Sequence, residues 1–257
     1  MITCHKRLYG KAIFLLLFFW ACSSPQSPAY LEGYLIPVDS ISAPQMDEAA
    51  DSLISVYRSA LEDEMQQVIA HSEHTMERGR PEGFLNNFVA DLIMETGEKL
   101  YNPSDGGSLD FTLLNYGGLR TSIPEGPVTR SRIFELMPFE NEMVVITLSP
   151  DKTNELFEYL ATEGIGMPVS GIRMTIMENG GWKASISGEP FDSNREYRVL
   201  TSDYLAGGGD NMVFFLEPEN EEYLGMRIRD AIIEYLEKRH SEGDVISSKL
   251  DGRITLE

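Results

Sequence analysis

Helical and strand-like hydrophobic patterns alternate along this chain from about residue 45 onward, and this alternation restricts its fold more than any other feature. Residues 46–70 repeat apolar side chains at three- and four-residue spacing, which predicts an amphipathic helix. Residues 109–114 are almost wholly apolar, as a short buried strand is. The alternation predicts one domain of mixed α/β (α+β) class over residues 45–257.

The other predicted elements follow from the same patterns. Ser149 is a predicted N-cap, because a proline follows it at the first helical position. A two-stranded hairpin is predicted around the turn at residues 179–181. The predicted helices cover residues 84–101, 129–136, 149–160 and 223–239, and the predicted strands cover residues 143–148, 172–177, 182–186 and 197–202.

The net charge and the scarcity of cysteine and histidine limit what the chain can bind. Lys and Arg number 21 against 41 Asp and Glu, which gives a formal net charge of −20. This charge argues against general affinity for nucleic acid or anionic lipid, since both are themselves negatively charged. With four histidines and two cysteines, the chain cannot build a Cys/His zinc cluster, and a dinuclear site would be almost all carboxylate.

The N-terminal residues have the pattern of an export signal. Lys6, Arg7 and Lys11 precede an apolar run at residues 12–21, which is shorter than the roughly 20 apolar residues that span a bilayer. Residues 19–22 resemble a bacterial lipoprotein box, in which the cysteine is diacylated and becomes the new N-terminus. We therefore expect a lipoprotein signal at 1–21, lipidation of Cys22, and a membrane-anchored protein facing the periplasm or the cell surface. The alternative is an ordinary cleaved signal followed by a chance cysteine.

Residues 22–44 are rich in serine, proline and tyrosine and have no sustained period. This composition predicts a tether between the lipid and the domain. Cys4 leaves with the signal and Cys22 carries the lipid, so no disulfide is expected.

Three loops next to predicted strands carry the polar residues best suited to chemistry. They are Asn-Tyr-Gly-Gly-Leu-Arg at 115–120, Pro-Phe-Glu-Asn at 138–141, and Asp-Tyr-Leu-Ala-Gly-Gly-Gly-Asp at 203–210. The first is a turn that glycines make easily. Taken singly, Phe139 is better explained as a core aromatic and Arg120 as part of a surface ion pair.

As an ordered set, the three loops resemble the C-terminal, substrate-binding domain of the 5′-nucleotidase family. The family's motifs are Asn-x-Gly-Gly-(Ile/Leu)-Arg, Pro-Phe-x-Asn and Asn-Phe-Leu-Ala-x-Gly-Gly-Asp. Residues 82–91 resemble its helix signature and residues 169–172 its central strand entry. The resemblance covers about residues 46–235 and implies a single domain with the family's layered α/β/β/α architecture.

The resemblance implies a site for a nucleoside or nucleotide. Phe139 and Tyr204 match the aromatic clamp of the family, and each stacking contact with a base contributes roughly 1–3 kcal/mol. Asp210 matches the ribose-binding aspartate, and Arg120 is placed to meet a phosphate or ribose oxygen. The remaining substrate-binding residues implied are Asn115, Gly117, Gly118 and Asn141.

The chain departs from the family pattern at several positions. Tyr204 replaces a phenylalanine and brings a hydroxyl that needs a partner, and Asp203 replaces an asparagine. A further substrate arginine of the family falls on Gly79 in this sequence. Arg78 and Arg80 flank that position, so either is a candidate for the role.

The metal-binding motifs of the family's N-terminal metallophosphatase domain are absent from this sequence. These motifs are Asp-x-His, Gly-Asp-x-x-Asp and Gly-Asn-His-(Glu/Asp). His71 and His74 are interpreted as part of a solvated helix end rather than as metal ligands. We therefore expect no metal or other cofactor and no catalytic residue in this chain, with divalent metals only in a separate catalytic partner.

The sequence thus predicts a lipid-anchored nucleoside- or nucleotide-binding domain that acts with a separate metallophosphatase chain. Phosphomonoester hydrolysis is among the slowest uncatalysed reactions, so catalysis by this chain alone is not expected. Two alternatives stay open: a structural or adhesive lipoprotein that retains the fold without the ligand, and a self-sufficient nucleotidase with unrecognised metal ligands.

Overall fold

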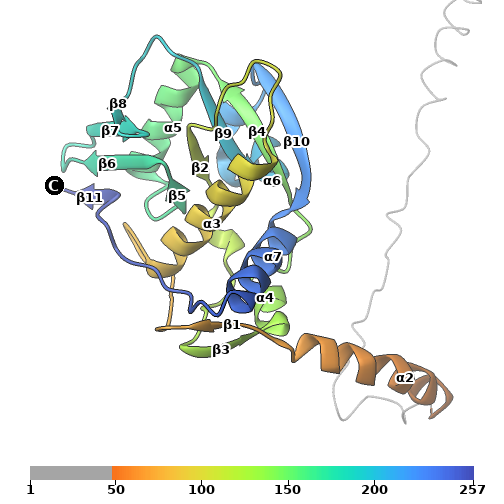
Figure 1. Ribbon diagram of the computed structural model, residues 1–257. Helices are drawn as coiled ribbons and strands as arrows, with labels where there is room; N and C mark the ends of the chain where they lie inside the picture. Colours follow the sequence, from red (N-terminus) through yellow and green to blue (C-terminus); the bar gives the residue numbers. More distant parts are fainter. Residues whose placement is uncertain (1–47) are drawn as a thin grey trace, which may run out of the picture. The chain divides into compact units, whose positions relative to one another are not determined.

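The computed structural model describes residues 48–257 (Figure 1). The predicted signal, Cys22 and the tether lie outside the described residues. The chain divides into two compact units at residues 1–51 and 52–257. Helix α2 (Glu48–Met65) begins in the first, and every other helix and strand below belongs to the second. Within residues 48–257, no helix is both long and apolar enough to cross a membrane.

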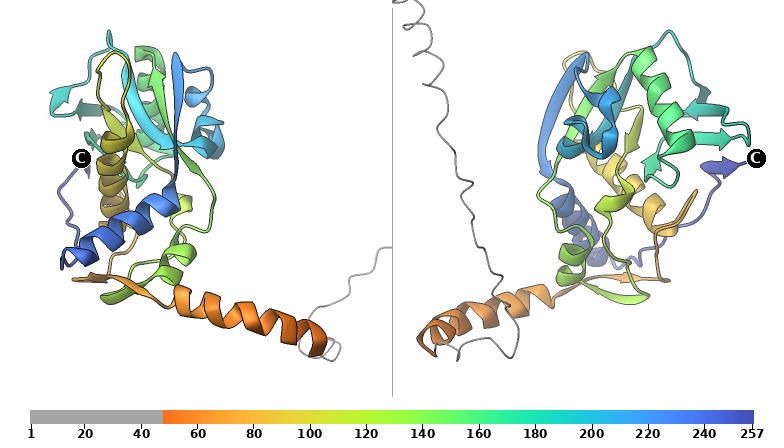
Figure 2. Two further views of the ribbon diagram at one scale, coloured as in Figure 1. Left: turned by 45° about the vertical axis from the view of Figure 1, so that its right-hand side comes forward. Right: turned by 180° about the vertical axis from the view of Figure 1, so that it is seen from behind.

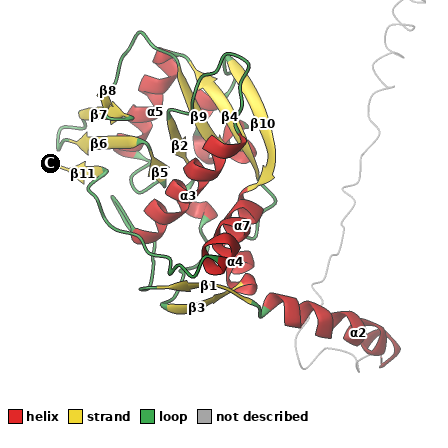
Figure 3. Ribbon diagram, viewed as in Figure 1, coloured by secondary structure: helices red, strands yellow, loops and turns green. Residues whose placement is uncertain are grey.

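A five-stranded mixed sheet forms the centre of the second unit (Figure 3). β9 (Tyr197–Ser202) is parallel to β2 (Phe111–Leu113) and antiparallel to β4 (Glu142–Leu148). β10 (Asn220–Arg227) is antiparallel to β4, and β5 (Val169–Ser170) is antiparallel to β2. All of β2 and most of β4 are buried, as expected of strands covered on both faces. In spatial order the strands are β10 (Asn220–Arg227), β4 (Glu142–Leu148), β9 (Tyr197–Ser202), β2 (Phe111–Leu113) and β5 (Val169–Ser170).

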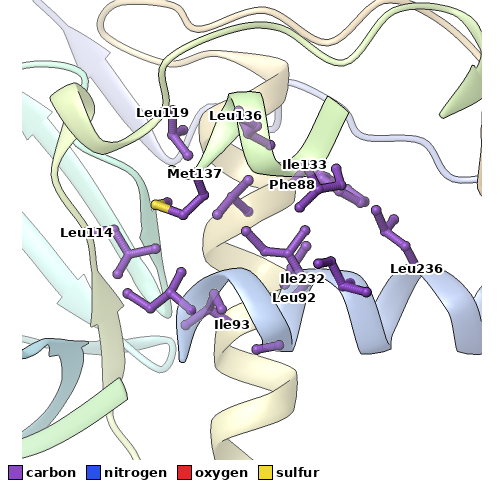
Figure 4. Close-up of a cluster of buried hydrophobic side chains, with 14 of the residues drawn as sticks. Phe88, Leu92, Ile93, Leu114, Leu119, Ile133, Leu136, Met137, Ile232 and Leu236 are labelled. Carbon is purple, nitrogen blue, oxygen red and sulfur yellow. The ribbon is translucent and has the colours of Figure 1, made fainter. Parts of the chain in front are cut away.

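Three helices pack together in a hydrophobic core beside this sheet: α3 (Phe84–Leu100), α4 (Arg130–Leu136) and α7 (Ile228–Ser241) (Figures 2 and 4). Phe88 and Leu92 of α3 belong to the same buried cluster as Ile232 of α7 and Ile133 of α4. Full burial of an aliphatic side chain of this size stabilises a fold by about 1.5–3 kcal/mol. The helices therefore stabilise the sheet from this side.

The second core contains helix α5 (Pro150–Thr162), the central sheet and a four-stranded sheet. Phe157 of α5 lies 4.9 Å from the ring of Trp182 and 6.5 Å from that of Phe111, so one side chain contacts both sheets. The four-stranded sheet has the order β11 (Ile254–Leu256), β6 (Ile172–Ile176), β7 (Trp182–Ile186) and β8 (Glu189–Pro190). The predicted mixed α/β class is confirmed.

Several predicted elements are confirmed closely. The helix expected at 84–101 is α3, and the hairpin expected around 179–181 is the antiparallel pair β6–β7. Ser149 caps α5 by accepting a hydrogen bond from the Lys152 amide at 3.4 Å. Thr129 caps α4 in the same way.

The first predicted helix was too long. α2 ends at Met65, and residues 68–72 form strand β1 (Val68–Ser72), which pairs with β3 (Gly126–Thr129). Pairing with a distant strand buries Ile69, and this tertiary contact overrides the local helical period. His71 therefore lies on a strand, where its ring stacks on that of His240 at 5.6 Å. The interpretation of this segment as a helix end was wrong.

The last predicted helix began too early. Residues 223–227 belong to strand β10, and α7 begins at Ile228. The residues of β10 alternate between exposed and half-buried, as an edge strand's do. Within β10, the spacing of Tyr223, Leu224 and Met226 also fitted a helix, because short apolar patterns do not separate the two structures.

Candidate functional site

Four neighbouring strands bring their ends to one edge of the central sheet. β2 and β9 are parallel, so the residues after both strands, including Asn115 and Asp203, lie at the same edge. β4 is antiparallel to β9, so the residue before it, Asn141, lies there too. β10 is antiparallel to β4 and delivers Ile228 to the same edge. Topology therefore gathers loops that are far apart in sequence.

These loops enclose a pocket of about 360 Å³. Eight of the substrate-binding residues predicted from the sequence lie on its wall. The two aromatic residues predicted as a clamp are partly solvent-accessible: Phe139 is 40% exposed and Tyr204 is 45% exposed. The pocket is lined by Leu114, Asn115, Gly117, Gly118, Arg120, Met137, Phe139, Asn141, Ser202, Tyr204, Asp210 and Ile228.

The first loop is a short 3-10 turn, Tyr116–Gly118, that lets an asparagine fold back over it. A β-carbon on Gly118 would lie 2.7 Å from Asn115 Oδ1, so only glycine leaves room for that side chain. Asn115 Nδ2 donates to Asp210 Oδ2 at 3.0 Å. The glycine turn thus joins the first loop to the third across the pocket.

The second loop is held by the start of α7. The buried Arg229 donates to the Phe139 carbonyl at 3.3 Å and to Glu140 Oε1 at 2.5 Å, and its guanidinium lies over the ring of Phe134. The Ile228 amide donates to the Asn141 carbonyl at 2.9 Å. The hydrogen bond from Arg229 lowers the pKa of Glu140. This anchoring leaves the Phe139 ring on the wall of the pocket.

The third loop places Tyr204 and Asp210 in direct contact. Tyr204 Oη donates to Asp210 Oδ1 at 2.8 Å, and this hydrogen bond raises the pKa of Tyr204. Burial raises the pKa of Tyr159, with a smaller contribution from the negative charge of Asp210; its hydroxyl donates to the Asp210 carbonyl at 3.0 Å. Asp203 accepts from Asn141 Nδ2 at 2.8 Å. Both pocket asparagines therefore donate their amide groups to aspartates.

Three arginines lie around the glycine turn. The guanidinium groups of Arg78 and Arg80 each lie 4.6 Å from the centre of the Tyr116 ring, and Arg78 also donates to the Tyr116 carbonyl. Arg120 donates to the Gly117 carbonyl at 3.2 Å and lines the pocket. Arg78 and Arg80 are not among the lining residues of the pocket, and both stay exposed beside it. The structure does not choose between them.

Four residues of the pocket wall were missed by the sequence analysis. Leu114, Met137 and Ser202 each adjoin a recognised motif, and the apolar character of the first two could have suggested a pocket floor. Ile228 gave no signal, because its segment was assigned to the middle of a helix. The supporting Arg229 was missed for the same reason.

The pocket offers aromatic faces, oxygen acceptors and one guanidinium. Flat ligands stack on aromatic rings, vicinal hydroxyls donate to a carboxylate, and an anion binds a guanidinium. In the part of the chain that the structure describes, no group of three or more His, Cys, Asp or Glu side chains is placed to hold a metal ion. The arrangement suits a ligand that joins a flat ring to a polyol and an anion.

The chain is similar in sequence to part of several known proteins. It is 25% identical over 240 residues to a trifunctional nucleotide phosphoesterase of Bacillus subtilis. This alignment covers 86% of this chain and 16% of that protein. It is 23% identical to an apyrase of Tabanus yao, over 81% of this chain and 40% of the apyrase. The chain therefore spans less than half the length of these relatives.

Two solved structures resemble this chain in fold. A 5′-nucleotidase precursor from Thermus thermophilus superposes with a TM-score of 0.65 at 26% identity, over 84% of this chain and 44% of that one. A Haemophilus influenzae NAD nucleotidase shares the fold, with a TM-score of 0.60 at 19% identity over 83% of this chain and 42% of that one. The 5′-nucleotidase C-terminal domain family matches residues 68–217, more than half of the sequence. The chain belongs to the 5′-nucleotidase C-terminal domain family.

Proposed function

We propose that this chain binds a nucleoside or nucleotide in the pocket at the end of the central sheet. The observation that carries the proposal is the convergence of three sequence-distant loops on one cavity with two exposed aromatic residues. In this interpretation Phe139 and Tyr204 hold the base, and Asp210 accepts hydrogen bonds from the ribose. Arg120 meets the phosphate, with Arg78 or Arg80 close by.

Replacing Phe139 by alanine is expected to weaken the binding of adenosine and AMP by roughly 5- to 150-fold, because one stacking contact of about 1–3 kcal/mol is lost. Calorimetric titration of the purified chain measures this. Tyr223→Ala is the matched control, since Tyr223 is 54% exposed but lies outside the pocket wall. Equal affinities for the wild type and the Phe139 variant, or no binding at millimolar ligand, would contradict the proposal.

We further propose that a separate metallophosphatase chain performs the hydrolysis. We also propose that the protein described here is an exported lipoprotein anchored through its Cys22. The support is that the chain matches the C-terminal domain of the 5′-nucleotidase family, while the metallophosphatase motifs are absent from the sequence. The divalent metals would then belong to the partner.

Mild detergent extraction of the chain from its native membranes tests both points in one preparation. The expected result is a diacylated N-terminal Cys22 by mass measurement, a co-purifying metallophosphatase, and AMP hydrolysis that disappears when the two chains are separated and returns on mixing. Full hydrolytic activity of the separated chain would contradict the partner proposal, and an unmodified Cys22 would contradict the anchor.

A further inference from the structure

The hydroxyl of Tyr204 makes two hydrogen bonds to one residue. It donates to the Asp210 carboxylate at 2.8 Å and accepts from the Asp210 main-chain amide at 3.2 Å. The ring of the same tyrosine lies directly over Gly209, where a β-carbon would come within 2.5 Å of ring atoms. The aromatic wall of the pocket and its carboxylate are therefore tied together through one side chain.

The backbone of the loop that carries Asp210 has an uncommon conformation. The φ angles of Gly208, Asp210 and Asn211 are 83°, 52° and 61°. These values lie in the left-handed region, which residues other than glycine seldom adopt. Two tyrosines support Asp210 in this conformation. Tyr159 donates to its carbonyl, whereas Tyr204 contacts its amide and its carboxylate. Of the two tyrosines, Tyr204 is therefore the one that contacts the charged group itself.

The carboxylate keeps capacity for a ligand despite these bonds. A carboxylate offers about four lone-pair directions. The Asp210 carboxylate accepts one hydrogen bond on each oxygen, from Tyr204 at Oδ1 and from Asn115 at Oδ2. Among residues 48–257, no further donor takes up the second direction on each oxygen, and these two directions match the two donors of a vicinal diol.

Resting on the proposed function, the geometry points to the Tyr204 hydroxyl as a positioning group that fixes the Asp210 carboxylate for a ribose cis-diol. A phenylalanine at this position would supply the same stacking surface without that coupling. The tyrosine thus connects recognition of the flat ring with recognition of the sugar, and it favours ligands that carry both hydroxyls.

The test compares adenosine with 2′,3′-dideoxyadenosine, which has the same base but no diol, by calorimetric titration of the purified chain. Tyr204→Phe is expected to weaken adenosine binding roughly tenfold, as loss of a hydrogen bond to a charged group does. Binding of the dideoxy ligand should change less than about twofold, because the stacking ring is kept. In an Asp210→Ala background, Tyr204→Phe should have no further effect on adenosine.

Tyr159→Phe is the matched control, because it removes a hydrogen bond to the main chain of Asp210 and leaves the carboxylate contacts in place. An effect on adenosine as large as that of Tyr204→Phe would overturn the inference, since loop support alone would then explain both. Equal losses for the two ligands in Tyr204→Phe, or no loss for either, would also overturn it while leaving the proposed function standing. Absence of binding by the wild type to both ligands would overturn both proposals.

Discussion

Replacing Arg253 by methionine is expected to lower the free energy of unfolding by about 3 kcal/mol, because it removes a buried guanidinium that bonds to two partly exposed aspartates. The Arg253 guanidinium donates to both oxygens of Asp91, to both oxygens of Asp251, and to the Val169 carbonyl. Arg253 itself is only 7% exposed. Methionine fills much of the volume but leaves these acceptors without their donor.

Thermal unfolding followed by circular dichroism measures the effect, which corresponds to a fall in melting temperature of roughly 6–12 °C for a domain of this size. Arg173→Met is the control, because Arg173 pairs with Asp251 at 3.7 Å through a side chain that is 60% exposed. A surface pair of this kind contributes about 0–1 kcal/mol. Equal melting temperatures for the two variants would show that the hydrogen bonds of Arg253 do not stabilise the domain.

Replacing Asn86 by alanine is expected to cost about 2 kcal/mol of stability and also to weaken AMP binding more than adenosine binding. Asn86 is buried, and its amide bonds to the amide and carbonyl of Gly79 and to the carbonyl of Gly166. Alanine leaves these main-chain groups without a partner inside the protein. Gly79 stands between Arg78 and Arg80, so its release moves both cations away from the glycine turn.

Denaturant titration and calorimetry together measure the two effects. Asn154→Ala is the control, since the Asn154 side chain donates to Glu158 one helical turn away at the surface. A change below about 0.5 kcal/mol is expected there. If the Asn86 variant lost stability but bound AMP and adenosine in the wild-type ratio, the segment carrying Arg78 and Arg80 would have no role in binding the phosphate.

The sequence analysis predicted the mixed α/β class. It also named eight candidate binding residues that the structure gathers around one pocket. It succeeded there because each loop carries its own local signal, such as the glycines beside Asn115 or the proline before Phe139. The roles of these residues in binding stay predictions. Sequence analysis was therefore successful for segments whose conformation depends on their own residues.

The errors came from contacts between distant segments. β1 forms because Val68–Ser72 pairs with Gly126–Thr129. The helical period of the preceding residues does not predict that pairing. β10 exists because it adds to the edge of β4. Arg229 supports the Phe139 loop across 90 residues of sequence. Such pairings are set by the assembled core, and no periodicity in one segment contains them.

The same long reach determines how the pocket comes into being during folding. Asn115 and Asp210 meet across 95 residues, and Asn141 and Asp203 across 62. Closing chain loops of this length costs entropy before any contact is gained, so the binding site forms only with the complete sheet. Deletion of a strand that carries a pocket loop, β2, β4 or β9, should therefore abolish recognition. A ligand, in turn, would protect the whole sheet from unfolding and not one loop alone.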